Sequence, residues 1–230
     1  MSKKLATNEE LMRIPYSEKP RIVVIGGGFG GIKLIKNIDT SKFQVVLLDR
    51  NNYHTFQPLL YQVATAGLEP DSIAGPLRKI FTKKKDFYFR VANVTSVDTE
   101  NNKVHSNIGS LSYDHLVLAN GSVTNYFGNK DFEEKSFPVK QIPHALNLRS
   151  QILQNFEKAV IKTDPEEVQS LMNYVVVGGG PTGVEISGAL GELKMHVLPN
   201  DYPELNLEKM QIYLIEELRN FWGVCQKSQA

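Results

Sequence analysis

The chain has 230 residues, 41% hydrophobic and 22% charged, a composition typical of globular proteins. Lys and Arg number 26 against 25 Asp and Glu, and this balance excludes strong sequence-independent attraction to nucleic acid or acidic lipid. The single cysteine, Cys225, excludes an intramolecular disulfide and a dithiol redox pair.

The amino-terminal region is polar, and residues 1–19 are predicted to be a flexible lead-in. They lack the apolar run of a signal peptide. No stretch of the chain reaches the roughly 18 consecutive apolar residues of a membrane span. We therefore expect a protein of the cytoplasm, or of the cytoplasmic face of the inner or plasma membrane.

The first 50 residues predict a strand, a glycine turn, a helix and a second strand. The apolar run 21–25 fits a strand buried on both faces of a parallel sheet. Glycines follow over 26–31, and the isoleucines at 32, 35 and 38 lie near one helical face. The run 43–48 predicts the next strand, which ends at Asp49.

The middle of the chain predicts shorter elements. They are a loop-rich insertion over 51–68, a short helix over 71–82, a strand over 87–91, antiparallel strands around Asn101-Asn102, a strand over 116–119, and a helix over 143–162.

The strand and glycine-turn pattern then returns, which indicates an internal duplication. Residues 174–177 predict a strand, and glycines follow at 178, 179, 180 and 183. A helix and a strand over 212–215 come next, with a surface loop expected over 195–209 because that segment is rich in Pro, Asn, Asp and Glu.

Each residue of the first glycine fingerprint has a distinct task in a dinucleotide site. Gly26 makes the tight turn, Gly28 lets the backbone approach a pyrophosphate, and Gly31 lets the helix pack on the sheet. The helix amino terminus offers unpaired N–H groups and partial positive charge to phosphate. Asp49 can accept hydrogen bonds from ribose hydroxyls.

The second fingerprint comprises Gly178, Gly180 and Gly183, and Glu216 ends its next strand. One fingerprint alone leaves a glycine turn of another α/β fold open, but two in matching context make that reading improbable. Two dinucleotides on one chain imply electron transfer between them, for which a flavin and a nicotinamide are the natural pair.

Three segments of the chain stand out together: Ile-Gly-Gly-Gly-Phe-Gly-Gly (25–31), the segment from Leu48 to Leu68, and Val-Val-Val-Gly-Gly-Gly-Pro-Thr-Gly-Val-Glu (175–185). They resemble type II NADH dehydrogenases, which are single-subunit NADH:quinone oxidoreductases built from two dinucleotide-binding domains, and the segment 48–68 is the family-specific part. The resemblance covers about residues 20–216. We expect an α/β fold of two Rossmann-like dinucleotide-binding domains (FAD/NAD(P)-binding fold), over 20–142 and 143–230. The second is incomplete, and the first carries a small antiparallel β insertion.

The resemblance implies FAD on the first fingerprint and NADH on the second. It places the segment 57–62 near the flavin and a quinone acceptor, and it implies catalytic roles for Gln57 and Glu185. The implied cofactor contacts are Gly26, Gly28, Phe29, Gly30, Gly31, Asp49, Arg50, Val94, Ala119, Asn120, Gly121, Gly178, Gly180, Pro181, Thr182, Gly183 and Glu216. The family more often has Thr at the position of Asn120.

Several roles stay open at this stage. Glu185 either contacts the nicotinamide or complements the helix dipole from the first turn. Glu216 favours NADH over NADPH because it would repel a 2′-phosphate, although Arg219 weakens this inference. Tyr53 and His54 are expected to pack the loop rather than do chemistry, and the five histidines show no metal-ligand spacing.

The chain ends earlier than the family it resembles, so we expect a truncated second domain. Two hypotheses follow: an NADH:quinone oxidoreductase, or a non-catalytic flavin-binding fragment of such an enzyme. Membrane contact is implied by the family alone, no nucleic-acid partner is expected, and a homodimer is left open.

Overall fold

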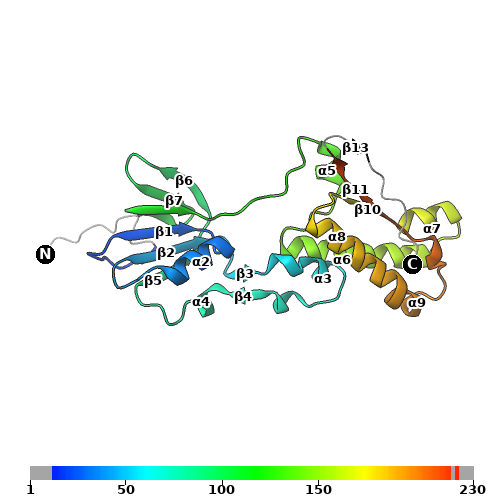
Figure 1. Cartoon of the computed structure of the whole chain (residues 1–230), viewed down its shortest axis with the longest axis horizontal. Coiled ribbons are helices and arrows are strands. Elements are labelled where there is room, and N and C mark those ends of the chain that lie inside the picture. The colour runs from blue at the N-terminus through cyan, green and yellow to red at the C-terminus, as the bar shows by residue number, and fades with distance from the viewer. Residues whose placement is uncertain (1–11, 219–220, 223–230) are drawn as a thin grey trace. The chain divides into compact units, whose positions relative to one another are not determined.

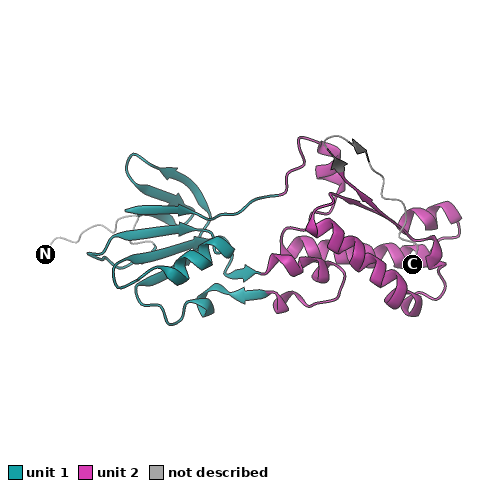
Figure 2. Cartoon of the chain, in the orientation of Figure 1, with its two compact units in different colours: residues 1–55, 74–123 teal, residues 56–73, 124–230 magenta. Residues whose placement is uncertain are grey.

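The structure is a computed structural model, and it describes residues 12–218 and 221–222. Arg219 and Cys225 lie outside the described residues. The chain divides into unit 1 (1–55 and 74–123) and unit 2 (56–73 and 124–230), which are shown in Figure 2 and described separately. The predicted domain boundaries, 20–142 and 143–230, remain a prediction.

A four-stranded parallel sheet forms the centre of unit 1 (Figure 1). Its order is β5 (Phe87–Val91), β2 (Gln44–Asp49), β1 (Arg21–Ile25) and β9 (His115–Leu118). The valines and leucines of β2 are fully buried, as predicted for a strand covered on both faces. Helix α2 (Phe29–Asn37) covers one face.

A three-stranded antiparallel sheet covers the other face of this sheet. It consists of β6 (Val94–Asp98), β7 (Lys103–Ser106) and β8 (Gly109–Ser112). Val104 and Leu111 are fully buried against residues of β1 and β2. The predicted antiparallel insertion is confirmed.

The helix predicted over 71–82 is only partly present. Pro70–Ser72 forms a 3-10 turn, Ala74–Pro76 forms strand β4, and only Leu77–Ile80 is α-helical, as α4. Strand β4 pairs antiparallel with β3 (Tyr53–Thr55), inside the expected loop-rich insertion. Proline disfavours a helical residue before it, so Gly75 stays extended and the helix starts after Pro76.

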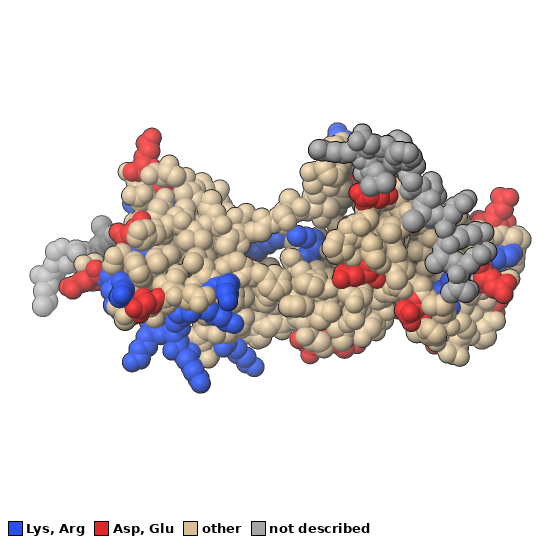
Figure 3. Space-filling view, viewed as in Figure 1, with Lys and Arg blue, Asp and Glu red and all other residues tan. Residues whose placement is uncertain are grey.

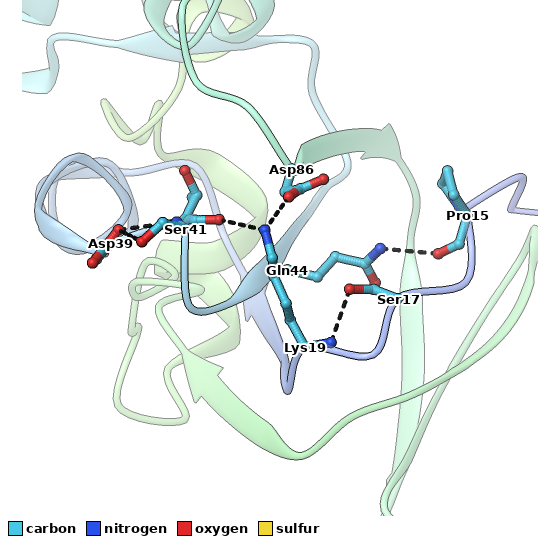
Figure 4. A network of polar contacts seen from close by, with 8 residues as sticks. Pro15, Ser17, Lys19, Asp39, Ser41, Gln44 and Asp86 are labelled. Carbon is cyan, nitrogen blue, oxygen red and sulfur yellow. Dashed lines mark hydrogen bonds and ion pairs between the residues drawn. The ribbon is translucent and has the colours of Figure 1, made fainter.

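The described part of the expected lead-in, residues 12–19, packs against the strands of its own unit. Met12 is 1% exposed, and the Arg90 guanidinium donates to its carbonyl oxygen. The Gln44 side chain donates to the Pro15 carbonyl at 2.9 Å. Figure 4 shows Lys19 near Gln44 and Pro15, with its ammonium group paired to Asp86.

Unit 2 contains a two-stranded parallel sheet, with helices on one of its faces. Strands β10 (Asn173–Val177) and β11 (Gln211–Ile215) pair in parallel. Helices α6 (Ile142–Ile161) and α8 (Pro181–Glu192) supply core residues to this face. Unit 2 also contains α3 (Leu60–Ala64), α5 (Lys130–Lys135) and α7 (Pro165–Leu171). A 3-10 turn, Gln57–Leu59, precedes α3, and the short strands Glu217–Leu218 (β12) and Phe221–Trp222 (β13) follow β11. Within the described residues, no helix combines the length and the hydrophobicity of a membrane-spanning segment.

The segment 195–209 is not the predicted surface loop. It contributes to a π-helical turn (Leu193–Val197), helix α9 (Leu198–Asp201) and a 3-10 turn (Leu207–Lys209). Leu198 and Tyr202 are buried, and the Tyr202 ring stacks on Phe156 with 5.3 Å between centroids. Apolar residues spaced among Pro and Asn therefore build part of the core of unit 2.

The second face of the β10–β11 pair is exposed. Successive side chains of a strand point to opposite faces of the sheet. Tyr174 and Val176 point toward the helices and pack into the core. The opposite face is an apolar ladder, formed by Val175, Val177, Tyr213 and Ile215, each 46–59% exposed.

Basic side chains gather on one surface of unit 1 (Figure 3). Residues 29–38 and 74–85, which include α2 and α4, contain no Asp or Glu. Their exposed cations are Lys33, Lys36, Arg78, Lys79, Lys83 and Lys85. The nearly balanced net charge of the chain is therefore unevenly distributed, with a positive surface on unit 1.

Candidate functional site: two glycine turns

The first glycine turn lies at the carboxyl end of β1. Gly26 has a φ of +107°, and its N–H donates to the Leu48 carbonyl at 2.8 Å. A Cβ on Gly26 would lie 2.3 Å from the Ala119 carbonyl oxygen, and a Cβ on Gly31 would lie 2.0 Å from the Gly26 carbonyl oxygen. Both positions therefore require glycine.

The outer part of this turn, residues 28–30, is exposed, and we call it the rim. Gly28, Phe29 and Gly30 are exposed, and a Cβ on either glycine would meet no atom within 4 Å. Helix α2 starts at Phe29, and no side chain caps its amino terminus. The N–H groups of the first helical turn thus face a space that can take a phosphate.

Asp49 closes the inner side of the turn. Its Oδ2 accepts from the Gly27 N–H at 2.6 Å, and its Oδ1 accepts from the Asn51 N–H at 2.7 Å. Gly27 itself was missed in the sequence. A Cβ there would lie 2.7 Å from a methyl group of Leu77 and 3.3 Å from the Asp49 carboxylate. The available signal in the sequence was that Gly27 is the middle of three consecutive glycines.

The predicted 119–121 turn lies beside Gly26. The Ala119 N–H donates to the Ile25 carbonyl at 2.8 Å, and the Asn120 backbone lies within 2.9 Å of a Cβ placed on Gly26. Gly121 has a φ of +71° with open space around it. Val94 begins β6 half-buried, and Arg50 is exposed directly after Asp49.

The second glycine turn repeats this geometry at the carboxyl end of β10. Gly178 has a φ of +107°, and a Cβ on Gly183 would lie 1.8 Å from the Gly178 carbonyl oxygen. Gly180 is exposed and open, as are Pro181 and Thr182 at the start of α8.

Glu216 follows β11 and takes the place that Asp49 has in unit 1. Its Oε2 accepts from the Gly179 N–H. A Cβ on Gly179 would meet this carboxylate oxygen at 3.1 Å, so the middle glycine again admits the acid. The predicted pairing of a glycine turn with an acidic strand end is present in both units.

The two predicted catalytic side chains both belong to unit 2. Gln57 is exposed, and its side-chain amide donates to the Lys140 carbonyl at 3.5 Å. Glu185 is half-buried. The sequence predicted it in the first turn of the helix, but it is the fifth residue of α8 and lies just beyond that turn. Helix α3, which follows Gln57, contacts α8. Because dipole effects fade beyond the first turn, the geometry argues against a capping role for Glu185.

His54 is a contact that the sequence did not predict. Its Nδ1 lies 3.1 Å from the Gly27 carbonyl oxygen, and its ring meets the Phe29 ring edge-on with 4.9 Å between centroids. No spacing rule connects a histidine in a short strand with a glycine turn that precedes it in the chain. Only the fold brings these residues together.

Comparisons with known proteins agree with this arrangement. The chain is 37% identical over 209 residues to "Type II NADH:quinone oxidoreductase Ndh" of Mycobacterium tuberculosis, covering 88% of this chain and 45% of that protein. It is 34% identical to "External alternative NAD(P)H-ubiquinone oxidoreductase B1, mitochondrial" of Solanum tuberosum, covering 83% of this chain and 35% of that protein.

A solved structure is similar as well. The NDH2 structure from Plasmodium falciparum in complex with NADH superposes with a TM-score of 0.81 at 29% identity, covering 86% of this chain and 42% of that chain. This chain therefore spans less than half the length of these relatives. Residues 20–225 match the family described as pyridine nucleotide-disulphide oxidoreductase. The chain belongs to the pyridine nucleotide-disulphide oxidoreductase family.

Proposed function

We propose that the chain carries the nucleotide-binding part of an NADH:quinone oxidoreductase, with FAD on the first glycine turn and NADH on the second. The observation that carries this proposal is the repeated turn. Each turn has a glycine at φ +107°, two residues further on an exposed glycine, and an acidic residue that accepts a hydrogen bond from the N–H of the middle glycine. These are the elements that a dinucleotide needs for its pyrophosphate and its ribose.

The residues of each turn fit these groups. The N–H groups at the start of α2 and α8 would hold pyrophosphate, and each carboxylate has further lone pairs for ribose hydroxyls. Asp49 already accepts two backbone N–H groups, which hold it in place. Glu216 would disfavour the 2′-phosphate of NADPH by charge repulsion.

When bound, FAD would accept a hydride from NADH and pass two electrons to the quinone. Glu185 would contact the nicotinamide, and Gln57 would lie near the flavin and the quinone. The names of the Mycobacterium and Solanum relatives support quinone as the acceptor. The single cysteine argues against dithiol chemistry. The Solanum relative is named for ubiquinone, which is a lipid, and on that ground we also propose peripheral contact with a membrane.

The test is reduction of bound flavin. The purified chain, loaded with FAD, should lose the visible absorption of oxidised flavin when NADH is added without oxygen, and a water-soluble quinone should restore it. Flavin that binds but is not reduced would support the non-catalytic alternative.

Two matched variants assign the turns. Gly28→Val should abolish FAD retention because its side chain would occupy the open rim. Gly180→Val should keep FAD and abolish its reduction by NADH. Retention of FAD by Gly28→Val would overturn the assignment of the first turn.

A further inference from the structure

We propose that His54 is a positioning residue that orients the backbone N–H of Gly28 toward the pyrophosphate of the bound dinucleotide. This inference rests on the proposed function of the first glycine turn. It starts from the contact between His54 Nδ1 and the Gly27 carbonyl oxygen at 3.1 Å.

The geometry of the peptide bond links the two groups. The described chain has no cis peptide bond, so the carbonyl of Gly27 and the N–H of Gly28 point in opposite directions across one planar unit. A donor that holds the Gly27 oxygen therefore also fixes the direction of the Gly28 N–H. That N–H lies at the exposed rim, where a Cβ on Gly28 would meet no atom within 4 Å.

A glycine turn needs such a restraint because glycine has wide backbone freedom. The Asp49 carboxylate holds the Gly27 N–H at 2.6 Å, and Leu77 lies directly against Gly27. With His54 on the carbonyl, the residue is held on both of its peptide groups. A donor that is already oriented does not have to be ordered when the ligand binds, which improves affinity.

His54 is itself held in position. It is the middle residue of β3, whose partner across the pair is Gly75 of β4. Its ring packs edge-on against Phe29, the first residue of α2, at an interplanar angle of 88°. The hairpin thus delivers an N–H donor to the turn from outside the strand–turn–helix motif.

The second turn has no such restraint among the described residues. Glu216 holds the Gly179 N–H, but no side chain of the described region donates to the Gly179 carbonyl. The first turn is therefore held at both the N–H and the carbonyl of its middle glycine, and the second turn at the N–H alone.

The experiment uses two substitutions that separate hydrogen bonding from packing. His54→Asn keeps an N–H donor near the position of Nδ1 and loses the ring. His54→Phe keeps an aromatic ring against Phe29 and loses the donor. The dissociation constant of FAD, measured by flavin fluorescence on the full chain, is expected to rise about tenfold for His54→Phe, as the loss of one oriented hydrogen bond predicts, and to stay near the unaltered value for His54→Asn.

A second ligand localises the effect. ADP contains the pyrophosphate without the flavin ring, so its affinity as a competitor of FAD should fall in parallel with that of FAD in His54→Phe. Riboflavin, which lacks phosphate, should bind equally to all three proteins. NADH binding at the second turn should be unchanged in both variants, and the unchanged binding of riboflavin shows that unit 1 is folded.

Two results would overturn the proposal. The first is weaker FAD binding by His54→Asn with normal binding by His54→Phe, which would mean that the role of the ring is to pack the loop. The second is equal FAD affinity in all three proteins. Failure of the unaltered chain to bind FAD would instead overturn the proposed function, and with it this inference.

Discussion

The two glycine turns share a sequence pattern but differ in what surrounds them. A Cβ on Gly26 would lie 2.3 Å from the carbonyl oxygen of Ala119, which directly follows the neighbouring strand β9, whereas a Cβ on Gly178 would meet no atom within 4 Å. The first turn belongs to a four-stranded sheet and the second to a two-stranded one. The fingerprint thus specifies the local bend, while the strand next to it determines how firmly that bend is held.

The largest expected effect comes from adding a methyl group under each turn. Gly31→Ala and Gly183→Ala both place a Cβ within 2.0 Å of a carbonyl oxygen. Gly26 cannot retreat because Ala119 blocks it, so we expect Gly31→Ala to cost about 3–4 kcal/mol of local stability and Gly183→Ala about 1–2 kcal/mol. Hydrogen exchange of each unit measures the two losses.

Gly191→Ala is the matched control for this pair. Gly191 lies in α8 with open space around it, and a helical Gly→Ala change there should stabilise by about 0.5–1 kcal/mol. Equal losses in Gly31→Ala and Gly183→Ala would contradict the difference in support.

The acidic residues provide a smaller contrast. Asp49→Asn leaves one oxygen for two backbone N–H groups, so one buried donor loses its acceptor, at a cost of about 1–3 kcal/mol. Glu216 accepts from one N–H group among the described residues, and Glu216→Gln keeps an oxygen for it, so this change should cost about 0.5–1 kcal/mol. Denaturant unfolding measures the loss of unfolding free energy in each variant. A larger loss in Glu216→Gln than in Asp49→Asn would contradict this prediction.

Alkaline pH should weaken unit 2 through Tyr174. Burial raises the pKa of this phenol, which packs in the core beside Phe156. The unfolded phenol therefore loses its proton first, so stability that is complete below about pH 10 falls as the pH rises above it. Thermal unfolding should show this decline, and Tyr174→Phe should reduce it. If stability declined equally in Tyr174→Phe, the loss at alkaline pH would come from other titratable groups.

The exposed ladder of β10 and β11 should have the smallest effect on stability. Val175→Thr with Ile215→Thr keeps strand propensity and removes apolar surface, so stability should change by less than about 0.5 kcal/mol. Light scattering on storage should fall, because exposed apolar patches promote association. Val176→Thr, on the packed face, should instead cost about 1–2 kcal/mol. Unchanged scattering would show that the ladder does not drive association.

The elements predicted correctly are those with local causes. The buried strands, the glycine turns and Asp49 all follow from runs of neighbouring residues. The errors lie where distant segments meet. Strand β4 exists because it pairs with β3, and Tyr202 is buried because Phe156 lies beside it. The contact of His54 with Gly27 depends on the same hairpin, so no local pattern could have shown it.

The division of unit 1 into two segments has a consequence for synthesis on the ribosome. Residues 56–73 interrupt unit 1, yet Leu60, Val63 and Ala64 of α3 pack against Ala145 of α6. Helix α6 is completed about 100 residues later, which takes roughly 5–20 s at ordinary translation rates. During that interval the apolar side chains of α3 lack the surface of α6 that buries them in the folded chain.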